Sequence, residues 1–592
     1  MSGRVPPNDR NASIQGVQIN CAAEAYFAQI QTELDSIPIR IKPVSDSKTT
    51  SASQETPARA RWMHLFRMLR PSHAHSAFSA TVVLMVSTFL SSIIGLVRTK
   101  YIMWLFGSGI SADALNAAFV LPDMISYFLV GGAASITFVT ILTHYRETGR
   151  EAEGERSLSV ILSTMYLVLG GAIALAELLA PIYVAKMFPG YDAQKAALCV
   201  RLTRILLPAQ LCFFAGGVFG AVLLVRKQFT VQAVAPLIYN LGTILGGLFL
   251  VRQIGVSSLA LGTVAGAFFG PFFLNWFFAR RNGTHYRPIL DWHDEGLHEW
   301  VRLSLPLMAG VSLVTADKWI IAHFASRIGG AVSLFNYAKQ FFTAPMAVLA
   351  QAAGAASMPF FASLWARESH YEFATEVADS VSRVACMGLL ASSWMIALGE
   401  PLIDLVFTGG RFAGADAHLC SNYFAVFSVS MFLWSAQAIY ARSFYAAGNT
   451  FVPMVASTVV TVVSLPMYAA LFHSFGAMGL AVASDLGIAL QTLTIAFLLH
   501  QRRMVSLASL DFSELGRCLL TAVAAGGAVW VVFDWIGGRL SGMVAGHWLH
   551  GRVANLAVVL AGSCLWLVVA DVLLARTGSD LPRVARRRLG LA

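Results

Sequence analysis

Long apolar segments, separated by short polar loops, follow one another along the chain from residue 77 to residue 575. Each has about 20 residues or more, and at about 1.5 Å per residue such a helix crosses a hydrocarbon core of roughly 30 Å. The pattern predicts an all-α polytopic membrane protein with fourteen transmembrane helices. We place them at 77–105, 111–143, 158–186, 196–225, 229–251, 256–279, 300–325, 329–364, 377–407, 418–445, 450–473, 477–500, 515–536 and 553–575.

Residues 1–75 are polar and rich in Ser, Pro, Arg and Gln. They lack the apolar region that a cleavable signal would need near Met1. We therefore expect a mostly disordered cytoplasmic tail.

Composition agrees with a membrane protein, since 56% of the residues are hydrophobic and 12% are charged, against about 25% charged in soluble proteins. The net charge of +10 comes from cations dispersed in short loops and in the two tails, so we expect no nucleic-acid partner. With an even number of helices both termini lie on one side. That side would hold 21 Arg and Lys residues against about eight on the other, which predicts cytoplasmic termini by the positive-inside rule.

An internal repeat is indicated by two short motifs. Asn116-Ala117-Ala118 recurs as Asn336-Tyr337-Ala338, and the Gly-Ala-Ala-Ser at 132–135 recurs at 354–357, with offsets of 220 and 222 residues. At the first offset Arg98 corresponds to Lys318. Because transporters are often built from two repeats with the binding site between them, we expect both cations to face a central cavity at similar depths.

Charged residues inside the apolar segments are the candidates for function, because an unpaired charge near hydrocarbon costs roughly 2.5 to 3.5 kcal/mol. Arg98 and Asp113 flank a Gly-Ser-Gly turn, so we expect them to lie close together. Asp317 next to Lys318 suggests a partly self-compensating pair. Two further arginines, Arg201 and Arg204, are expected near a helix start, with side chains that reach the membrane interface.

Motifs of enzymes are absent: the sequence has no nucleophile elbow, Walker loop or HExxH. The seven cysteines contain no C-x-x-C pair and indicate neither a disulfide framework nor a metal site. We therefore expect a non-enzymatic protein without a cofactor. Cations that face a cavity favour an anionic ligand. A cation-coupled small-molecule exporter is one alternative, and a membrane scaffold without transport is another.

Several sequence blocks resemble the lipid II flippase family, also called MurJ or MviN. The blocks are Gly95-Leu96-Val97-Arg98, Phe106-Gly107-Ser108-Gly109, Ala112-Asp113-Ala114, Leu121-Pro122, Asn336-Tyr337-Ala338, Gly409-Gly410-Arg411-Phe412, Arg442-Ser443-Phe444-Tyr445-Ala446 and Gly476-Ala477-Met478-Gly479. The resemblance implies a member of the multidrug/oligosaccharidyl-lipid/polysaccharide exporter superfamily. It implies an N-lobe of six helices at 76–279, a C-lobe of six helices at 280–500, and two extra helices with a basic tail at 501–592.

The family's function implies a substrate as well. Its members are understood to move an undecaprenyl-diphosphate-linked peptidoglycan precursor, lipid II, across the bacterial cytoplasmic membrane through a cationic cavity, by alternating access. Membrane lipids are the other implied partner, and no partner protein is indicated. Arg98, Asp113 and Ser91 match functional positions of the family. With Asn116, Lys318 and Lys339 they form the expected substrate-binding set, and Asp317 is a candidate for ion coupling.

The chain also departs from the family pattern. Neutral residues stand where the family often has charges, and the cation after Asn336-Tyr337-Ala338 comes one position early, about 100° around the helix. The neutral positions are Ser92, Ser126, Tyr127, Gly131 and Gln340. Another polyprenyl-linked oligosaccharide is therefore the alternative cargo.

Overall fold

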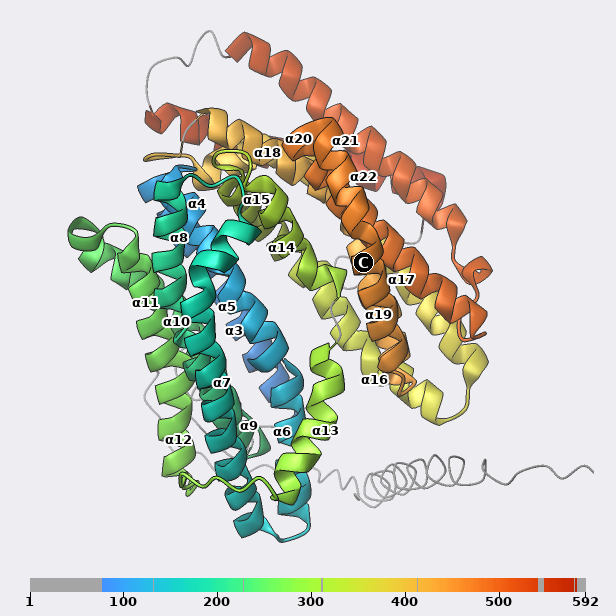
Figure 1. Cartoon of the computed structure of the whole chain (residues 1–592). Coiled ribbons are helices and arrows are strands. Elements are labelled where there is room, and N and C mark those ends of the chain that lie inside the picture. Colours follow the sequence, from blue (N-terminus) through green and yellow to red (C-terminus); the bar gives the residue numbers. More distant parts are fainter. Residues whose placement is uncertain are drawn as a thin grey trace, which may run out of the picture. The chain divides into compact units, whose positions relative to one another are not determined.

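The computed structural model describes residues 77–130, 132–226, 228–309, 312–412, 414–540, 548–579 and 581–582. These residues belong to one compact unit, Arg70–Ala592. The predicted N-terminal tail, Gly131 and most of the basic C-terminal tail lie outside the described residues. Within them the chain is built from helices, as predicted, and the protein is a multi-pass membrane protein (Figure 1).

The first bundle of helices, here called the N-bundle, contains the first half of the described chain. Helix α3 packs on α10, α10 on α11, and α4 on α8. Its elements are α3 (Ala77–Phe106), α4 (Ile110–Ala118), α5 (Val120–Ile125), η1 (Ser126–Val130), α6 (Gly132–Glu147), α7 (Glu151–Met187), α8 (Ala193–Leu206), α9 (Ala209–Val225), α10 (Phe229–Ile254), α11 (Ser257–Ala267), η2 (Phe268–Leu274) and α12 (Asn275–Arg281).

The second bundle, here called the C-bundle, is organised around α17 and α20. Helix α14 packs on α20, α15 on α18, and α19 on both α17 and α20. Its elements are α14 (Leu313–Ala325), α15 (Ala331–Met346), η3 (Ala347–Ala352), α16 (Ala353–Ala366), α17 (His370–Phe407), α18 (Gly414–Val429), α19 (Met431–Ala446) and α20 (Phe451–Gln501).

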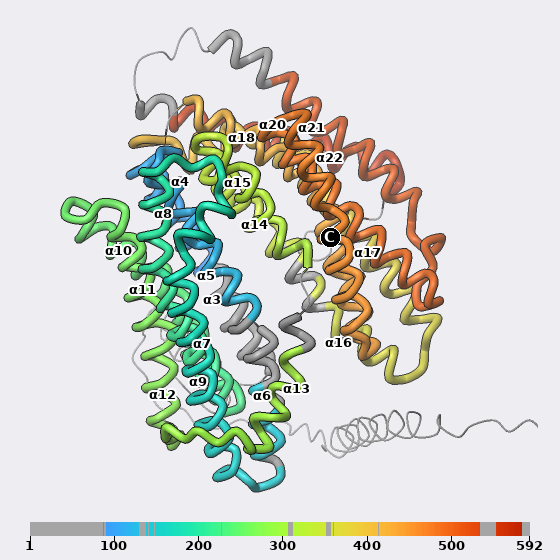
Figure 2. Tube along the Cα trace, in the orientation of Figure 1, coloured from blue at the N-terminus to red at the C-terminus, as the bar shows by residue number. Residues whose placement is uncertain are grey.

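Three further helices complete the described chain. Helix α13 (Glu295–Ala309) precedes α14 but packs on α6 and α7 of the N-bundle. After the short η4 (Leu507–Ser509), α21 (Phe512–Leu540) and α22 (Trp548–Thr577) pack on each other and on α17. The last two helices thus cover one side of the C-bundle (Figure 2).

Breaks divide several of the predicted spans into shorter helices. The predicted span 111–143 is interrupted by the π-helical turn η1, and the span 256–279 by η2, which contains Pro271. Proline removes a backbone donor and favours such irregular turns. Among the described residues, eight helices are long and apolar enough to cross a membrane, or nine if the bent pair α18–α19 is one span. The number fourteen remains a prediction.

Two glycines with the same backbone conformation show the internal repeat in the structure. Gly255 joins α10 to α11 with φ 58° and ψ −138°, and Gly476 interrupts α20 with φ 59° and ψ −137°. Their offset is 221 residues, and the positive φ is a conformation that glycine adopts without steric cost. Gly255 follows α10, which packs on α3, and Gly476 lies in α20, which packs on α14. The two halves therefore share both the glycine turn and the pairing of helices.

Candidate functional site

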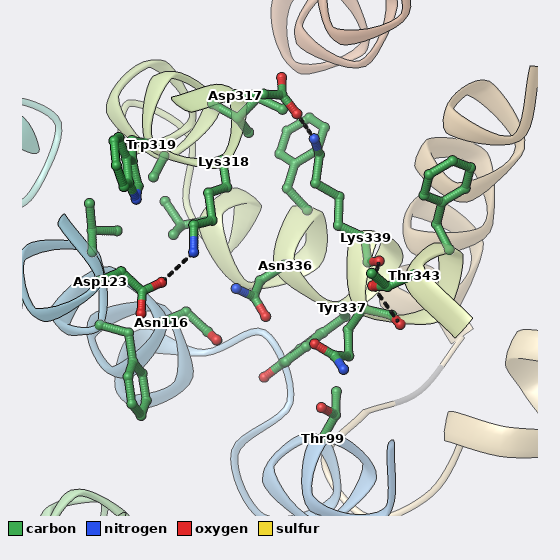
Figure 3. A pocket seen from close by; sticks show the side chains of 18 of the residues that line it. Thr99, Asn116, Asp123, Asp317, Lys318, Trp319, Asn336, Tyr337, Lys339 and Thr343 are labelled. Carbon is green, nitrogen blue, oxygen red and sulfur yellow. Dashed lines mark hydrogen bonds and ion pairs between the residues drawn. The ribbon is translucent and has the colours of Figure 1, made fainter. Parts of the chain in front are cut away.

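A cavity of about 550 Å³ lies between the N-bundle and the C-bundle (Figure 3). Helices α3, α4, α5 and α10 line one side, and α14, α15 and the second half of α20 line the other. The charged residues that line it in the described part of the chain are three cations and two carboxylates: Arg98, Lys318, Lys339, Asp123 and Asp317. Charges at this position agree with the rule that intramembrane ions face a bundle interior or a wet cavity.

Arg98 lines the cavity from α3, about two turns before the end of that helix. Its guanidinium lies beside the phenol of Tyr239 on α10, and its Nε is buried with no hydrogen-bond partner among the described atoms. A buried donor without a partner costs roughly 1 to 3 kcal/mol. Arg98 therefore presents hydrogen-bonding capacity that the described protein atoms do not satisfy.

Next to Arg98 the cavity wall holds a polar side pocket of about 350 Å³ between α3 and α10. Ser91 lies about two turns before Arg98, and its hydroxyl accepts a hydrogen bond of 3.2 Å from Asn240 Nδ2. The polar residues that line this pocket are Ser87, Ser91, Ser92, Arg98, Gln232, Asn240 and Gln340. Hydroxyls and amides around one guanidinium form a surface that can hydrogen-bond a polar uncharged group beside an anion.

Lys318 reaches across the cavity to the N-bundle. Its ammonium donates to the Asp123 carboxylate on α5 at 2.6 Å, as Figure 3 shows. Both side chains are nearly half exposed, at 48% and 42%. The ion pair therefore joins the two bundles through solvent-accessible groups, and such pairs are worth about 0 to 1 kcal/mol.

Lys339 points to the C-bundle side of the cavity, where it forms an ion pair with the buried Asp317. The same carboxylate accepts hydrogen bonds from the Tyr468 hydroxyl and, at 3.0 Å, from the Ser484 hydroxyl. The expected pair between Asp317 and its neighbour Lys318 is thus wrong. Consecutive helical residues point in directions about 100° apart, so the two side chains find different partners.

Asp113 is not a neighbour of Arg98 in the way that the turn suggested. Its side chain is fully buried and forms an ion pair with Lys195 near the start of α8. Its other oxygen accepts the Ser333 backbone N–H at 2.8 Å, close to the start of α15. The expectation of an Arg98–Asp113 pair is corrected, because Asp113 faces α8 and α15 rather than the cavity.

The bundles are hydrogen-bonded to each other where α3 ends and α15 begins, a region here called the gate end. The Tyr337 hydroxyl donates to the Gly107 carbonyl at 3.1 Å, and the Ser108 hydroxyl donates to Asp416 at 2.7 Å. The Arg411 N–H donates to the Trp104 carbonyl at 3.0 Å. These contacts, with the one between Asp113 and Ser333, close the cavity at this end.

The two halves contribute to the gate end in a related way. A Cβ on Gly410 would lie 2.2 Å from the Trp104 carbonyl oxygen, and one on Gly190 would lie 2.3 Å from the Arg327 Cα. The two glycines are 220 residues apart. Gly410 thus lies against the last turn of α3, and Gly190 lies against the turn that follows α14. Each half places a loop glycine against the other half.

Asn116 lines the cavity, and its amide donates to the Ala112 carbonyl at 2.9 Å and to the Ser333 hydroxyl at 3.3 Å. Three of the neutral departures also lie at the cavity or beside it, and one of them is Ser92 in the side pocket. Gln340 lines both the cavity and the side pocket, and the Tyr127 ring packs edge-on against Trp319, with centroids 5.7 Å apart. Ser126 begins the turn η1.

Comparison with known proteins decides the family. The family model described as lipid II flippase MurJ matches residues 102–541. The chain belongs to the lipid II flippase MurJ family. A relative from Haemophilus influenzae, named as a probable lipid II flippase MurJ, is 26% identical over 81% of this chain and 98% of its own length.

Solved structures show the same fold. A lipid II flippase MurJ in an inward closed conformation matches with a TM-score of 0.69 at 17% identity, over 84% of this chain and 99% of that chain. A multidrug resistance MATE family transporter of the MOP superfamily, in an inward-facing conformation, matches with a TM-score of 0.59 at 15% identity, over 72% of this chain and 98% of that chain. The resemblance seen in the sequence blocks is confirmed at the level of family and fold.

Sequence reasoning missed the partners of the charged residues. Lys195 lies just outside the predicted helix 196–225, although Asp192 three residues earlier is a helix-capping residue whose carboxylate accepts the Lys195 N–H at 2.7 Å. That capping pattern indicated that Lys195 lies in the first turn of a helix. Tyr239, Tyr468 and Ser484 carried no comparable signal, because single hydroxyl groups are common in apolar helices.

Proposed function

We propose that this chain moves a polyprenyl-diphosphate-linked peptidoglycan precursor, lipid II, across the bacterial cytoplasmic membrane by alternating access. The proposal includes no chemical step and no cofactor. Membership of the lipid II flippase MurJ family and the cationic cavity between the bundles support it.

Arg98 carries the proposal, because its buried Nε has no partner among the described atoms. A guanidinium holds phosphate oxygens through parallel charge-assisted hydrogen bonds, so we assign the diphosphate of the cargo to Arg98. We assign the adjoining sugar and peptide groups to the side pocket, where Ser91 and Asn240 offer a hydroxyl and an amide. Asn116 and Lys318 would contact the cargo from the other walls of the cavity.

Asp113 would act on the cargo indirectly. Its buried carboxylate joins α4 to α8 and α15, so its role would be to hold the gate end closed while the cargo enters. With cytoplasmic termini the gate end faces away from the cytoplasm, and the cavity would load from the cytoplasmic side. Opening the gate end would then release the cargo to the outer leaflet.

Asp317 would couple transport to an ion only if Lys339 left it. In this structure the ammonium of Lys339 neutralises the carboxylate, which leaves no uncompensated charge to attract a second cation. We therefore infer that Lys339 takes the place of a coupling cation at Asp317 in this conformation.

A different polyprenyl-linked oligosaccharide is the second candidate cargo. It is favoured by the neutral lining, since Gln340 offers an amide to both pockets where the family often has an arginine. A diphosphate link is common to both cargoes, so the role of Arg98 would be the same for each.

Binding to the purified chain tests the proposal. Lipid II, an unrelated polyprenyl diphosphate and a neutral polyprenol should be titrated against wild type, Arg98→Lys and Arg98→Ala, with folding checked by thermal stability. We expect the affinity for the two diphosphates to fall in the order wild type, Arg98→Lys, Arg98→Ala. Lysine keeps the charge but loses the paired hydrogen bonds. Equal binding of lipid II to wild type and to a folded Arg98→Ala would contradict the proposal.

A further inference from the structure

Two arginines lie on an open cleft that is separate from the central cavity. The cleft, of about 730 Å³, runs between α7 and α8, which lie side by side (Figure 2). Arg201 and Arg204 are both exposed and lie one turn apart on α8, and Glu177 faces them from α7. The remaining lining is apolar: Pro181, Val184, Ala185, Ala196, Ala197, Val200 and Ile205.

The level of these arginines in the membrane follows from the lengths of the helices. About 20 residues cross a hydrocarbon core of roughly 30 Å. Counted from Leu158, just after the charged start of α7, this length ends near Glu177. Counted back from Val225, before Arg226, it ends near Leu206. The arginines therefore lie at the boundary between hydrocarbon and lipid headgroups on the gate-end side, in the second half of α8 rather than at its start.

Arg204 has one structural partner that explains only part of the arrangement. Pro181 has no N–H, so the Glu177 carbonyl, four residues earlier, lacks its helical donor. Arg204 Nε donates to that carbonyl at 3.0 Å. Arg201 makes no such bond among those described, and no ion pair within 4.0 Å joins it or Arg204 to Glu177 in the described residues.

The charge distribution makes this pair unusual. On the gate-end side the predicted loops hold about eight cations in all, against 21 on the other side. Two exposed guanidiniums at headgroup level can donate to lipid phosphates, which are the abundant acceptors there. Toward the hydrocarbon the outer face of α7 is apolar and open, with Val168 45% and Leu175 56% exposed, as an acyl chain requires.

We propose that the α7–α8 cleft binds an anionic phospholipid of the gate-end leaflet, with its phosphate on Arg201 and Arg204 and its acyl chains along the exposed face of α7. Helix α8 also carries Lys195, which holds Asp113 at the gate end. A lipid in the cleft therefore contacts α8, the helix that carries one member of this ion pair. The site is independent of the cargo assigned to the central cavity.

Native mass spectrometry of the purified full chain with phosphatidylglycerol and phosphatidylcholine tests the proposal. Arg201→Gln should weaken phosphatidylglycerol binding roughly fivefold, the contribution of one basic residue at an anionic membrane surface, and barely change that of phosphatidylcholine. Arg252→Gln is the matched control, because Arg252 is exposed in the last turn of α10 and lies outside the cleft.

Arg204 needs a variant that preserves the helix. In Arg204→Gln/Pro181→Ala the new N–H at residue 181 gives the Glu177 carbonyl a helical donor, so the loss of the arginine is separated from an orphaned carbonyl. We expect this variant to bind phosphatidylglycerol roughly fivefold more weakly than Pro181→Ala alone. Unchanged binding in both arginine variants, an equal loss in Arg252→Gln, or preferential retention of a polyprenyl diphosphate by the cleft would each overturn the proposal.

Discussion

The buried ion pair between Asp113 and Lys195 yields the prediction with the largest expected effect on stability. Their side chains are 0% and 9% exposed, so neither charge reaches bulk solvent. Lys195→Met keeps most of the side-chain volume and removes the charge. Breaking such a pair leaves an uncompensated buried ion and costs about 3 to 5 kcal/mol. Because Asp113 keeps its hydrogen bond from the Ser333 N–H, we expect Lys195→Met to lower the free energy of unfolding by about 3 kcal/mol, near the lower end of that range.

The double variant Lys195→Met/Asp113→Asn distinguishes the cost of an uncompensated charge from the cost of losing the lysine side chain itself. Replacing both charges by neutral groups removes the uncompensated ion, so most of the lost stability should return. Thermal unfolding of the purified variants, followed by size-exclusion chromatography, gives the measurement. The matched control is Lys186→Met, an exposed lysine in the last turn of α7 on the same side of the membrane.

Two results would refute this reasoning. One is a Lys195→Met variant as stable as Lys186→Met, which would show that Asp113 has no need of its buried partner. The other is a double variant no more stable than Lys195→Met, which would show that the loss came from packing rather than from the orphaned carboxylate.

Three further predictions concern the cavity, the gate end and the topology. Asp123→Asn should release Lys318 and tighten binding of a polyprenyl diphosphate roughly two- to fivefold in titration, within the worth of an exposed ion pair; weaker binding would mean that Asp123 itself contacts the cargo. Gly410→Ala should lower the thermal midpoint more than Gly448→Ala, because both have positive φ but a Cβ at Gly410 would collide with the Trp104 carbonyl and one at Gly448 meets open space; equal midpoints would show that the contact yields. A cysteine in place of the exposed His285 should be protected from an impermeant reagent in intact cells, and strong labelling would reverse the predicted topology.

The helices were predictable because their signal is local. A run of about 20 apolar residues identifies a membrane helix without reference to the rest of the chain, and each predicted segment coincides with helix in the described residues. The correspondence of Arg98 with Lys318 was predictable for a similar reason, since a repeat preserves offsets, and both residues line the cavity. Their binding roles remain predictions.

The partners of the charges were not predictable, because they depend on how distant helices pack. Asp113 meets Lys195 across 82 residues, and Lys318 meets Asp123 across 195. Nearness in the sequence favoured Arg98 as the partner of Asp113 and Lys318 as the partner of Asp317. Side chains that are close in the sequence nevertheless point in different directions from their helices and meet different neighbours. The breaks at η1 and η2 were also missed, since proline inside an apolar run does not say which carbonyls will find other donors.

Rescue of a bacterium depleted of its own lipid II flippase tests the central claim most directly. The account predicts that this chain restores growth and cell shape, that Arg98→Ala abolishes rescue while accumulating in the membrane to the wild-type level, and that Arg98→Lys rescues partially. Full rescue by Arg98→Ala at equal membrane abundance would contradict the account, because the cargo's diphosphate would then be held by something other than the guanidinium in the central cavity.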